Sequence, residues 1–378
     1  MKNEYLIGSC REHQLIIKHP ELSNMSVFPL EKTDLKLEEL SDFIEMCWMH
    51  DYGLEPRIRF SPEFLEWNMG KNLSGMAVRG STGELLGVYL CFERYYCLKG
   101  RTRAYAFETG LSVHPNHRGK GIGQWLAIAL KKMMVDKGVD FYLTWYDTRH
   151  NLPGSSFQIF TANTSGSDTS AHTGILLRIL NFNKALDYLA SNAFEVLCLK
   201  LKTRFFANPL KKRLPDGYTL EGFREERLSD YHDFMLRYQS VSKSWLIPAA
   251  KDFMRWQQER YNAARFYALR EKSSDRVLGV YFGHKIPLDD NWFYFQADGI
   301  LTDPDIDEKI AEAFFKNVEI RLNKDGLCMG VSAIETVCEN NLWQYGYLPI
   351  ISHLLTLTRL NSDEIKIEDL KNGLIELR

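Results

Sequence analysis

The sequence predicts an α/β protein built from mixed sheets, with two related domains of which the second is degenerate. Two observations predict this class. The chain has 378 residues, which is too long for one ordinary hydrophobic core. The same order of apolar patterns also occurs twice, at a spacing of about 190 residues. With 45% hydrophobic and 25% charged residues, the composition is typical of a globular protein.

Three pairs of similar stretches carry the repeat. They are Glu63-Phe-Leu-Glu-Trp67 with Asp252-Phe-Met-Arg-Trp256, Leu85-Leu-Gly-Val-Tyr-Leu90 with Val277-Leu-Gly-Val-Tyr-Phe282, and Tyr105 to Pro115 with Tyr294 to Pro304. Each copy predicts a helical stretch, a β-hairpin, a strand that ends in proline, a long helix and a buried strand. The hairpin turns are Gly80-Ser-Thr-Gly83 and Lys272-Ser-Ser-Asp275.

A segment punctuated by Pro and Gly, residues 208–217, separates the two copies and predicts a linker. The predicted organisation is an N-terminal extension (1–26), a first domain (27–207), this linker, a second domain (218–360) and a C-terminal tail (361–378).

Between the apolar strand that ends at Val113 and an amphipathic helix through Met133 lies Arg118-Gly119-Lys120-Gly121-Ile122-Gly123. A helix start exposes unpaired N–H groups and partial positive charge, which suits an anion. Glycines let phosphate oxygens approach the backbone, and the two cations add charge. The alternative is that this stretch binds no ligand and is only a turn that caps a surface helix.

The pattern Val-x-Pro-x-x-Arg-Gly-x-Gly-x-Gly, which begins at Val113, resembles the pyrophosphate-binding motif of the GNAT superfamily of acyl-CoA-dependent N-acyltransferases. The tandem arrangement resembles that of N-myristoyltransferases and mycothiol synthase. The resemblance implies that Leu111, Ser112 and Val113 bind the pantetheine arm, and that Arg118, Gly119, Lys120, Gly121, Ile122 and Gly123 bind the CoA pyrophosphate. Asn151, after the partner strand, is a further candidate for cofactor binding.

Transfer of an acyl group to an amine needs a base and a proton donor for the CoA thiolate. Glu108, on the strand that carries the thioester in this family, is the candidate base; a structural carboxylate is the alternative. Strand alternation places Glu108 on the face of Ser112 unless a bulge intervenes. Tyr146 and Tyr188 are further catalytic candidates. A core or cleft-wall position is the alternative for Tyr146, and packing or capping is the alternative for Tyr188, which is one residue out of the family's register.

Two further regions bear on the site. The aromatic-rich stretch Cys47-Trp-Met-His-Asp-Tyr52 is predicted to lie in a loop between helices that roofs the acceptor site; a small cluster of core side chains is an equal alternative. The second copy has Asp305, Asp307 and Glu308 where the first has the glycines. Acids there repel a pyrophosphate, so the second domain is not expected to bind CoA in the same way.

The net charge of −2 argues against a nucleic-acid partner. Seven cysteines without a CxxC pair favour reduced thiols in the cytoplasm, and neither a metal site nor a membrane span is expected. The predicted function is therefore transfer of acetyl from acetyl-CoA to an amine of a small molecule or peptide, by a monomer or homodimer. The alternatives are a long-chain acyltransferase similar to N-myristoyltransferases and a CoA-binding or scaffolding protein without turnover.

Overall fold

The structure, a computed structural model, describes residues 2–53, 58–69, 74–98, 101–147, 168–181, 197, 213–242, 251, 254–255, 264–287, 293–327, 329–333 and 348–362. Its helices in the N-terminal half are α1 (Lys2–Lys18), α2 (Leu37–Tyr52), α3 (Pro62–Met69) and α4 (Ile122–Asp136). Those in the C-terminal half are α8 (Leu228–Ser242) and α10 (Glu308–Lys324). None of the helices in the described ranges combines the length and apolar character needed to cross a membrane.

The strands form one sheet of 12 strands in the described part of the chain. Those of the first half are β1 (Ser26–Pro29), β2 (Ser74–Arg79), β3 (Leu85–Leu98), β4 (Arg101–Val113), β5 (Phe141–Asp147) and β6 (Asp168–Ile179). Those of the second half are β7 (Tyr218–Gly222), β8 (Ala264–Glu271), β9 (Val277–Pro287), β10 (Phe293–Thr302), β11 (Met329–Ala333) and β12 (Leu348–Arg359). Their order across the sheet is β1-β2-β3-β4-β5-β12-β6-β11-β10-β9-β8-β7. Adjacent strands are antiparallel except for β4–β5 and β10–β11, which are parallel, so the predicted mixed α/β sheet is confirmed.

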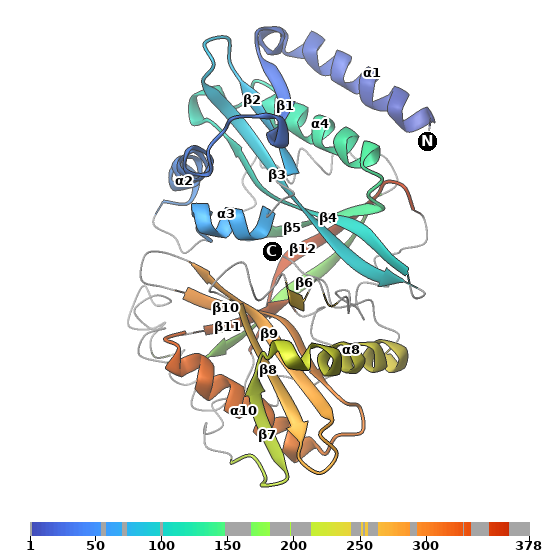
Figure 1. The fold of residues 1–378 in the computed structure, drawn as a ribbon. Coiled ribbons are helices and arrows are strands. Elements are labelled where there is room, and N and C mark those ends of the chain that lie inside the picture. Colours follow the sequence, from blue (N-terminus) through green and yellow to red (C-terminus); the bar gives the residue numbers. More distant parts are fainter. Residues whose placement is uncertain are drawn as a thin grey trace.

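The two halves exchange a strand at the centre of the sheet (Figure 1). The last strand, β12, pairs with β5 of the first half, whereas β6 of the first half pairs with β11 of the second. The strands β12 and β6 also pair with each other over most of their length. Each half is therefore completed by a strand that the other half contributes, and the domain boundaries taken from the sequence stay a prediction.

Polar contacts fix both exchanged strands. After β12, the backbone N–H groups of Leu360 and Asn361 both donate to the carbonyl of Asp140, just before β5. On β6, Arg178 makes a bidentate ion pair with Glu319 of α10, at 3.0 and 2.9 Å. This second pair is buried, so it joins the halves in the interior of the protein.

The glycine of the repeated Leu-Gly-Val-Tyr stretch has the same packing role in both halves. A Cβ at Gly87 on β3 would lie 2.8 Å from Ile122 of α4. A Cβ at Gly279 on β9 would lie 3.2 Å from the ring of Phe314 of α10. The missing side chain lets each long helix lie close to its sheet.

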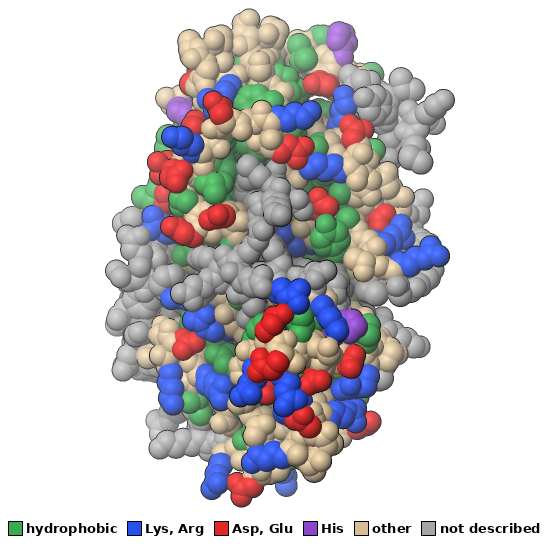
Figure 2. Space-filling model, viewed as in Figure 1, with side chains coloured by type: hydrophobic (Ala, Val, Ile, Leu, Met, Phe, Trp, Pro, Cys, Tyr) green, Lys and Arg blue, Asp and Glu red, His purple; other side chains and the backbone are tan. Residues whose placement is uncertain are grey.

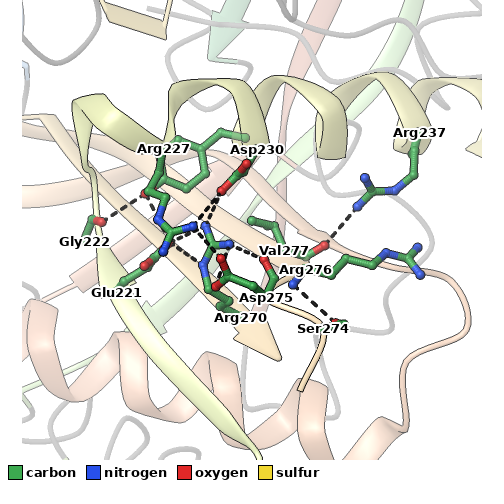
Figure 3. Close-up of polar contacts among 11 residues, drawn as sticks. Glu221, Gly222, Arg227, Asp230, Arg237, Arg270, Ser274, Asp275, Arg276 and Val277 are labelled. Atoms are coloured by element: carbon green, nitrogen blue, oxygen red, sulfur yellow. Dashed lines mark hydrogen bonds and ion pairs between the residues drawn. The ribbon is translucent and has the colours of Figure 1, made fainter. Parts of the chain in front are cut away.

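Both hairpins predicted from the repeat are confirmed, and their turns use a left-handed residue at the same place. In the first turn Gly83 has φ +89°, and in the second Asp275 has φ +54°. Figure 3 shows how charged side chains surround Asp275. It accepts from Arg227 at 2.6 Å, and the buried Arg270 contacts its carboxylate, Glu221 and Asp230. The hydrogen bond from Arg227 lowers the pKa of Asp275.

Helices cover both faces of the first half of the sheet. On one face α2 and α3 pack over a cluster that includes Phe60, Leu90 and Phe107. On the other, α4 packs over Tyr89 and Ala106, and the N-terminal helix α1 contributes Leu15 to the same cluster. The face seen in Figure 2 carries interspersed acidic and basic side chains over the described residues of both halves.

Candidate active site

The glycine-rich turn leads directly into α4. Gly119 and Gly121 both have left-handed backbones, with φ of +76° and +77°. Gly121 is the residue that caps the helix, so Ile122 and Gly123 lie in its first turn instead of in the loop. A Cβ at Gly119 would meet no atom within 4 Å, so this side of the turn is open. The turn thus combines an open backbone with a helix N-terminus, as an anion site requires.

The N-terminal segment packs against the same turn. A Cβ at Gly121 would lie 2.9 Å from Cδ2 of His19, which follows α1. Glu12 of α1 accepts a hydrogen bond at 2.8 Å from the indole of Trp125 in α4. The segment before residue 27 therefore forms one wall of the turn.

The strand before the turn has a β-bulge. Between the pairs Val88–Ser112 and Leu90–Thr109, β4 carries one residue more than β3. Gly110 lies in this bulge with φ +63°, a conformation that favours glycine. The bulge changes which side chains share a face of the sheet.

Glu108 therefore lies on the opposite face from Ser112. Glu108 is opposite Cys91 in the ladder, and its Oε2 accepts from the hydroxyls of Tyr89 at 2.9 Å and Thr144 at 2.8 Å, on the face that α4 covers. Ser112 contacts α2 on the other face. The simple alternation expected from the sequence is wrong here, because the extra residue reverses it. Glu108 is also only 2% exposed.

Beyond Glu108 the sheet opens between β4 and β5. Their parallel ladder ends at the pair Glu108–Thr144, although β4 continues to Val113 and β5 to Asp147. Over the same residues β5 stays paired with β12, up to Asp147 and His353. The two strands thus separate on the side of β4 that carries the bulge, as expected for a cleft between these strands. Glu108 marks the inner end of this opening.

The last turns of α2 are bonded to both predicted cofactor segments. The indole of Trp48 donates to Oγ of Ser112 at 3.1 Å. Asp51 makes a bidentate ion pair with Arg118, whose Nε also donates to the carbonyl of Val113. Residues 47–52 are helical instead of forming the predicted loop, because α2 continues to Tyr52. Burial raises the pKa of the Cys47 thiol to about 11.

Some predicted residues lie outside the described ranges. This holds for Asn151 and Tyr188 and for the side chain of Tyr146, whose backbone pairs with Leu354 on β12. In the described ranges, no group of three or more His, Cys, Asp and Glu side chains is arranged to hold a metal ion.

The second half keeps the bulge and the opening but replaces the anion site. On β10 a register shift lies between Ala297 and Gly299, and the ladder with β11 ends at Gln296 and Val331. At the start of α10, however, the carboxylate of Asp307 accepts from the N–H of Lys309 at 2.8 Å. A side chain of this half thus takes the position that a phosphate would need.

These features agree with the comparison to known proteins. Residues 37–154 match the family model of the Acetyltransferase (GNAT) family. This part of the chain is a GNAT domain. It contains the bulge, the opening between β4 and β5, and the turn before α4. No curated protein matches the sequence.

Solved structures extend the similarity to the whole chain. The N-myristoyltransferase of Saccharomyces cerevisiae with bound myristoyl-CoA and inhibitors has a TM-score of 0.65 at 15% identity, over 94% of this chain and 87% of the yeast chain. A GCN5-related N-acetyltransferase from Kribbella flavida has a TM-score of 0.51 at 11% identity, over 90% and 72% of the two chains. The protein therefore has the tandem GNAT fold, with a second half that lacks the glycine-rich turn.

Proposed function

We propose that the protein is an N-acyltransferase that transfers an acetyl group from acetyl-CoA to an amine of a small molecule or peptide. The observation that carries this proposal is the continuity of three features. Beside the opening between β4 and β5, the bulge at Gly110, the strand residues that follow it up to Val113 and the left-handed glycines before α4 come one after another along one strand and one turn. A CoA thioester has the same order of parts: reacting carbonyl, pantetheine arm and pyrophosphate.

Each part of the cofactor then has a partner in the chain. Leu111, Ser112 and Val113 border the opening and can bind the amide groups of the pantetheine arm with their backbone. The open backbone of the turn, together with Lys120, takes the pyrophosphate. Arg118 holds the turn and α2 together through Asp51 and the carbonyl of Val113, and its charge adds to that of Lys120 at the turn.

The amine attacks the thioester carbonyl, the negative charge collects on the carbonyl oxygen, and CoA leaves as a thiolate. We propose the backbone N–H groups of the bulge as donors to that oxygen, because a bulge takes residues out of regular pairing. We propose Glu108 as the acceptor of the amine proton, because it lies at the inner end of the opening. Its burial and its bonds to Tyr89 and Thr144 mean that the proton reaches it through these hydroxyls or a water.

The test is a screen of amine acceptors with acetyl-CoA, monitored by release of free thiol. Glu108→Gln should lower kcat while leaving the affinity for CoA unchanged, since Gln keeps the shape and accepts no proton. Thr144→Val removes one of the two hydroxyls that can pass the proton and leaves the carboxylate and the hydroxyl of Tyr89, so it should lower kcat less than Glu108→Gln. Equal kcat for the wild type and Glu108→Gln would remove Glu108 from this role.

A second candidate is transfer of a long-chain acyl group, favoured by the similarity to the yeast N-myristoyltransferase over 94% of the chain. Competition between myristoyl-CoA and acetyl-CoA distinguishes the two. A protein that only binds CoA would show affinity for acetyl-CoA and release no thiol with any acceptor.

A further inference from the structure

The bulge of β4 is closed on one side by two apolar side chains. A Cβ at Gly110 would lie 3.0 Å from Cδ1 of Leu90 and 3.5 Å from Cε1 of Phe60. These distances are van der Waals contacts or shorter, so nothing more fits between the bulge and the two side chains. Leu90 belongs to the neighbouring strand, whereas Phe60 reaches the bulge from the segment before α3.

Phe60 is held in this position from both sides. Its ring packs edge-on against Trp48, with centroids 5.0 Å apart, and against Phe64, with centroids 5.6 Å apart. Trp48 donates to Ser112, and the hydroxyl of Ser112 donates to the carbonyl of Gly110 at 3.1 Å. The ring that covers the bulge is thus tied through Trp48 to the strand that it covers.

The packing continues away from the bulge without reaching the surface. Phe60 is 5% exposed, and the aromatic row runs on through Phe64 to Trp67, whose ring lies 4.0 Å from that of His284 in the second half. His284 in turn makes a buried hydrogen bond to Asp298 at 2.6 Å. The space beyond Phe60 is therefore filled by side chains that span both halves.

We propose that Phe60 limits the length of the acyl chain that the site accepts. The inference rests on the proposed function, which places the thioester carbonyl at the bulge. An acetyl group ends at this wall, whereas a longer chain that leaves the bulge toward α2 and α3 meets the ring of Phe60. Because Trp48 and Phe64 brace the ring, it does not move aside without breaking the bond between Trp48 and Ser112.

The test compares CoA thioesters of increasing chain length, from acetyl through butyryl and octanoyl to myristoyl. Their affinities are measured by calorimetry, and kcat/KM by thiol release, in the wild type, Phe60→Leu, Phe60→Ala and Phe64→Ala. Phe64→Ala removes an equal ring from the same cluster, one that braces Phe60 instead of contacting the bulge itself. The quantity compared is the ratio of kcat/KM for octanoyl-CoA to kcat/KM for acetyl-CoA, called the octanoyl-to-acetyl ratio. Both values come from one preparation, so the ratio is independent of the fraction of folded protein.

In the wild type we expect the octanoyl-to-acetyl ratio to be well below one. Phe60→Ala should raise the ratio by about tenfold or more, since each methylene that enters an apolar pocket raises kcat/KM by about tenfold. Phe60→Leu, which shortens the wall, and Phe64→Ala, which removes one of its two braces, should each raise the ratio less than Phe60→Ala does. A wild type that accepts myristoyl-CoA as well as acetyl-CoA, or a ratio that is the same in all variants, overturns the inference while the proposed function stands. Failure of every variant to bind any CoA thioester overturns both.

Discussion

The ion pair between Arg178 and Glu319 gives a test of how the two halves are joined. Both side chains are buried, 3% and 1% exposed, and they meet in a bidentate geometry. At about 3 Å and an effective dielectric constant near 20, their attraction is roughly 5 kcal/mol, which the desolvation of the two ions largely offsets. Burial raises the pKa of Glu319, and the charge of Arg178 opposes that shift.

We therefore expect Glu319→Gln to lower the free energy of unfolding by about 3 to 5 kcal/mol, because it leaves a buried guanidinium without its counter-charge. Replacing both partners, as in Arg178→Met with Glu319→Leu, should recover most of this loss. The measurement is urea unfolding of the single and double variants, combined in a double-mutant cycle.

The chain offers a matched control in Arg213 and Asp216, which form a single-contact pair at 2.9 Å but are 87% and 88% exposed. Asp216→Asn should change the stability by no more than about 1 kcal/mol. If Glu319→Gln is as mild as Asp216→Asn, or if the double variant is as unstable as the two losses added together, the interior ion pair does not join the halves as described.

Four further predictions concern the cofactor turn, the second half, a thiol and the exchanged strands. Gly119→Asp should weaken CoA binding in calorimetry by about 1 to 4 kcal/mol through charge repulsion, whereas Gly119→Asn should keep most of the affinity. One CoA should bind per chain, because Asp307 caps α10; a stoichiometry of two in the wild type would contradict this. Burial raises the pKa of the Cys47 thiol to about 11, so in native protein iodoacetamide should modify Cys47 much more slowly than the exposed Cys10. Peptide mass spectrometry measures the two rates, and equal rates would refute the prediction. A chain that ends at residue 217 should not fold, since β6 loses both of its partners and β5 loses one of its two; a soluble product that unfolds cooperatively would disprove it.

Local patterns in the sequence were enough to predict the elements around the turn. The strand before Val113, the helix after Gly121 and both hairpins depend on short-range periodicity and on turn residues, and the structure confirms them. The change from glycines to Asp305, Asp307 and Glu308 could also be predicted from the sequence, because equivalent positions of the two copies can be compared directly.

Features that depend on pairing between distant residues were not predicted. The extra residue at Gly110 is recognised only when β4 is paired with β3. It places Glu108 and Ser112 on opposite faces of the sheet. The exchange of β6 and β12 has no local signal, because a strand pattern does not show with which strand it pairs, and the polar residues 168–174 at the start of β6 predict a loop. Trp48 and Asp51 were noted only as part of an aromatic-rich loop, and their bonds to Ser112 and Arg118 follow from where α2 ends.

The exchanged strands also affect how the chain folds while it is being made. β5 ends at Asp147 and its partner β12 begins at Leu348, so about 200 residues must be synthesised before the edge of β5 is covered. At about 5 to 20 residues per second, this takes roughly 10 to 40 seconds. Throughout that time an apolar strand edge of the nascent GNAT domain is open to other chains. The ribosome-bound first half is thus an aggregation-prone intermediate that should depend on chaperones until the last strand arrives.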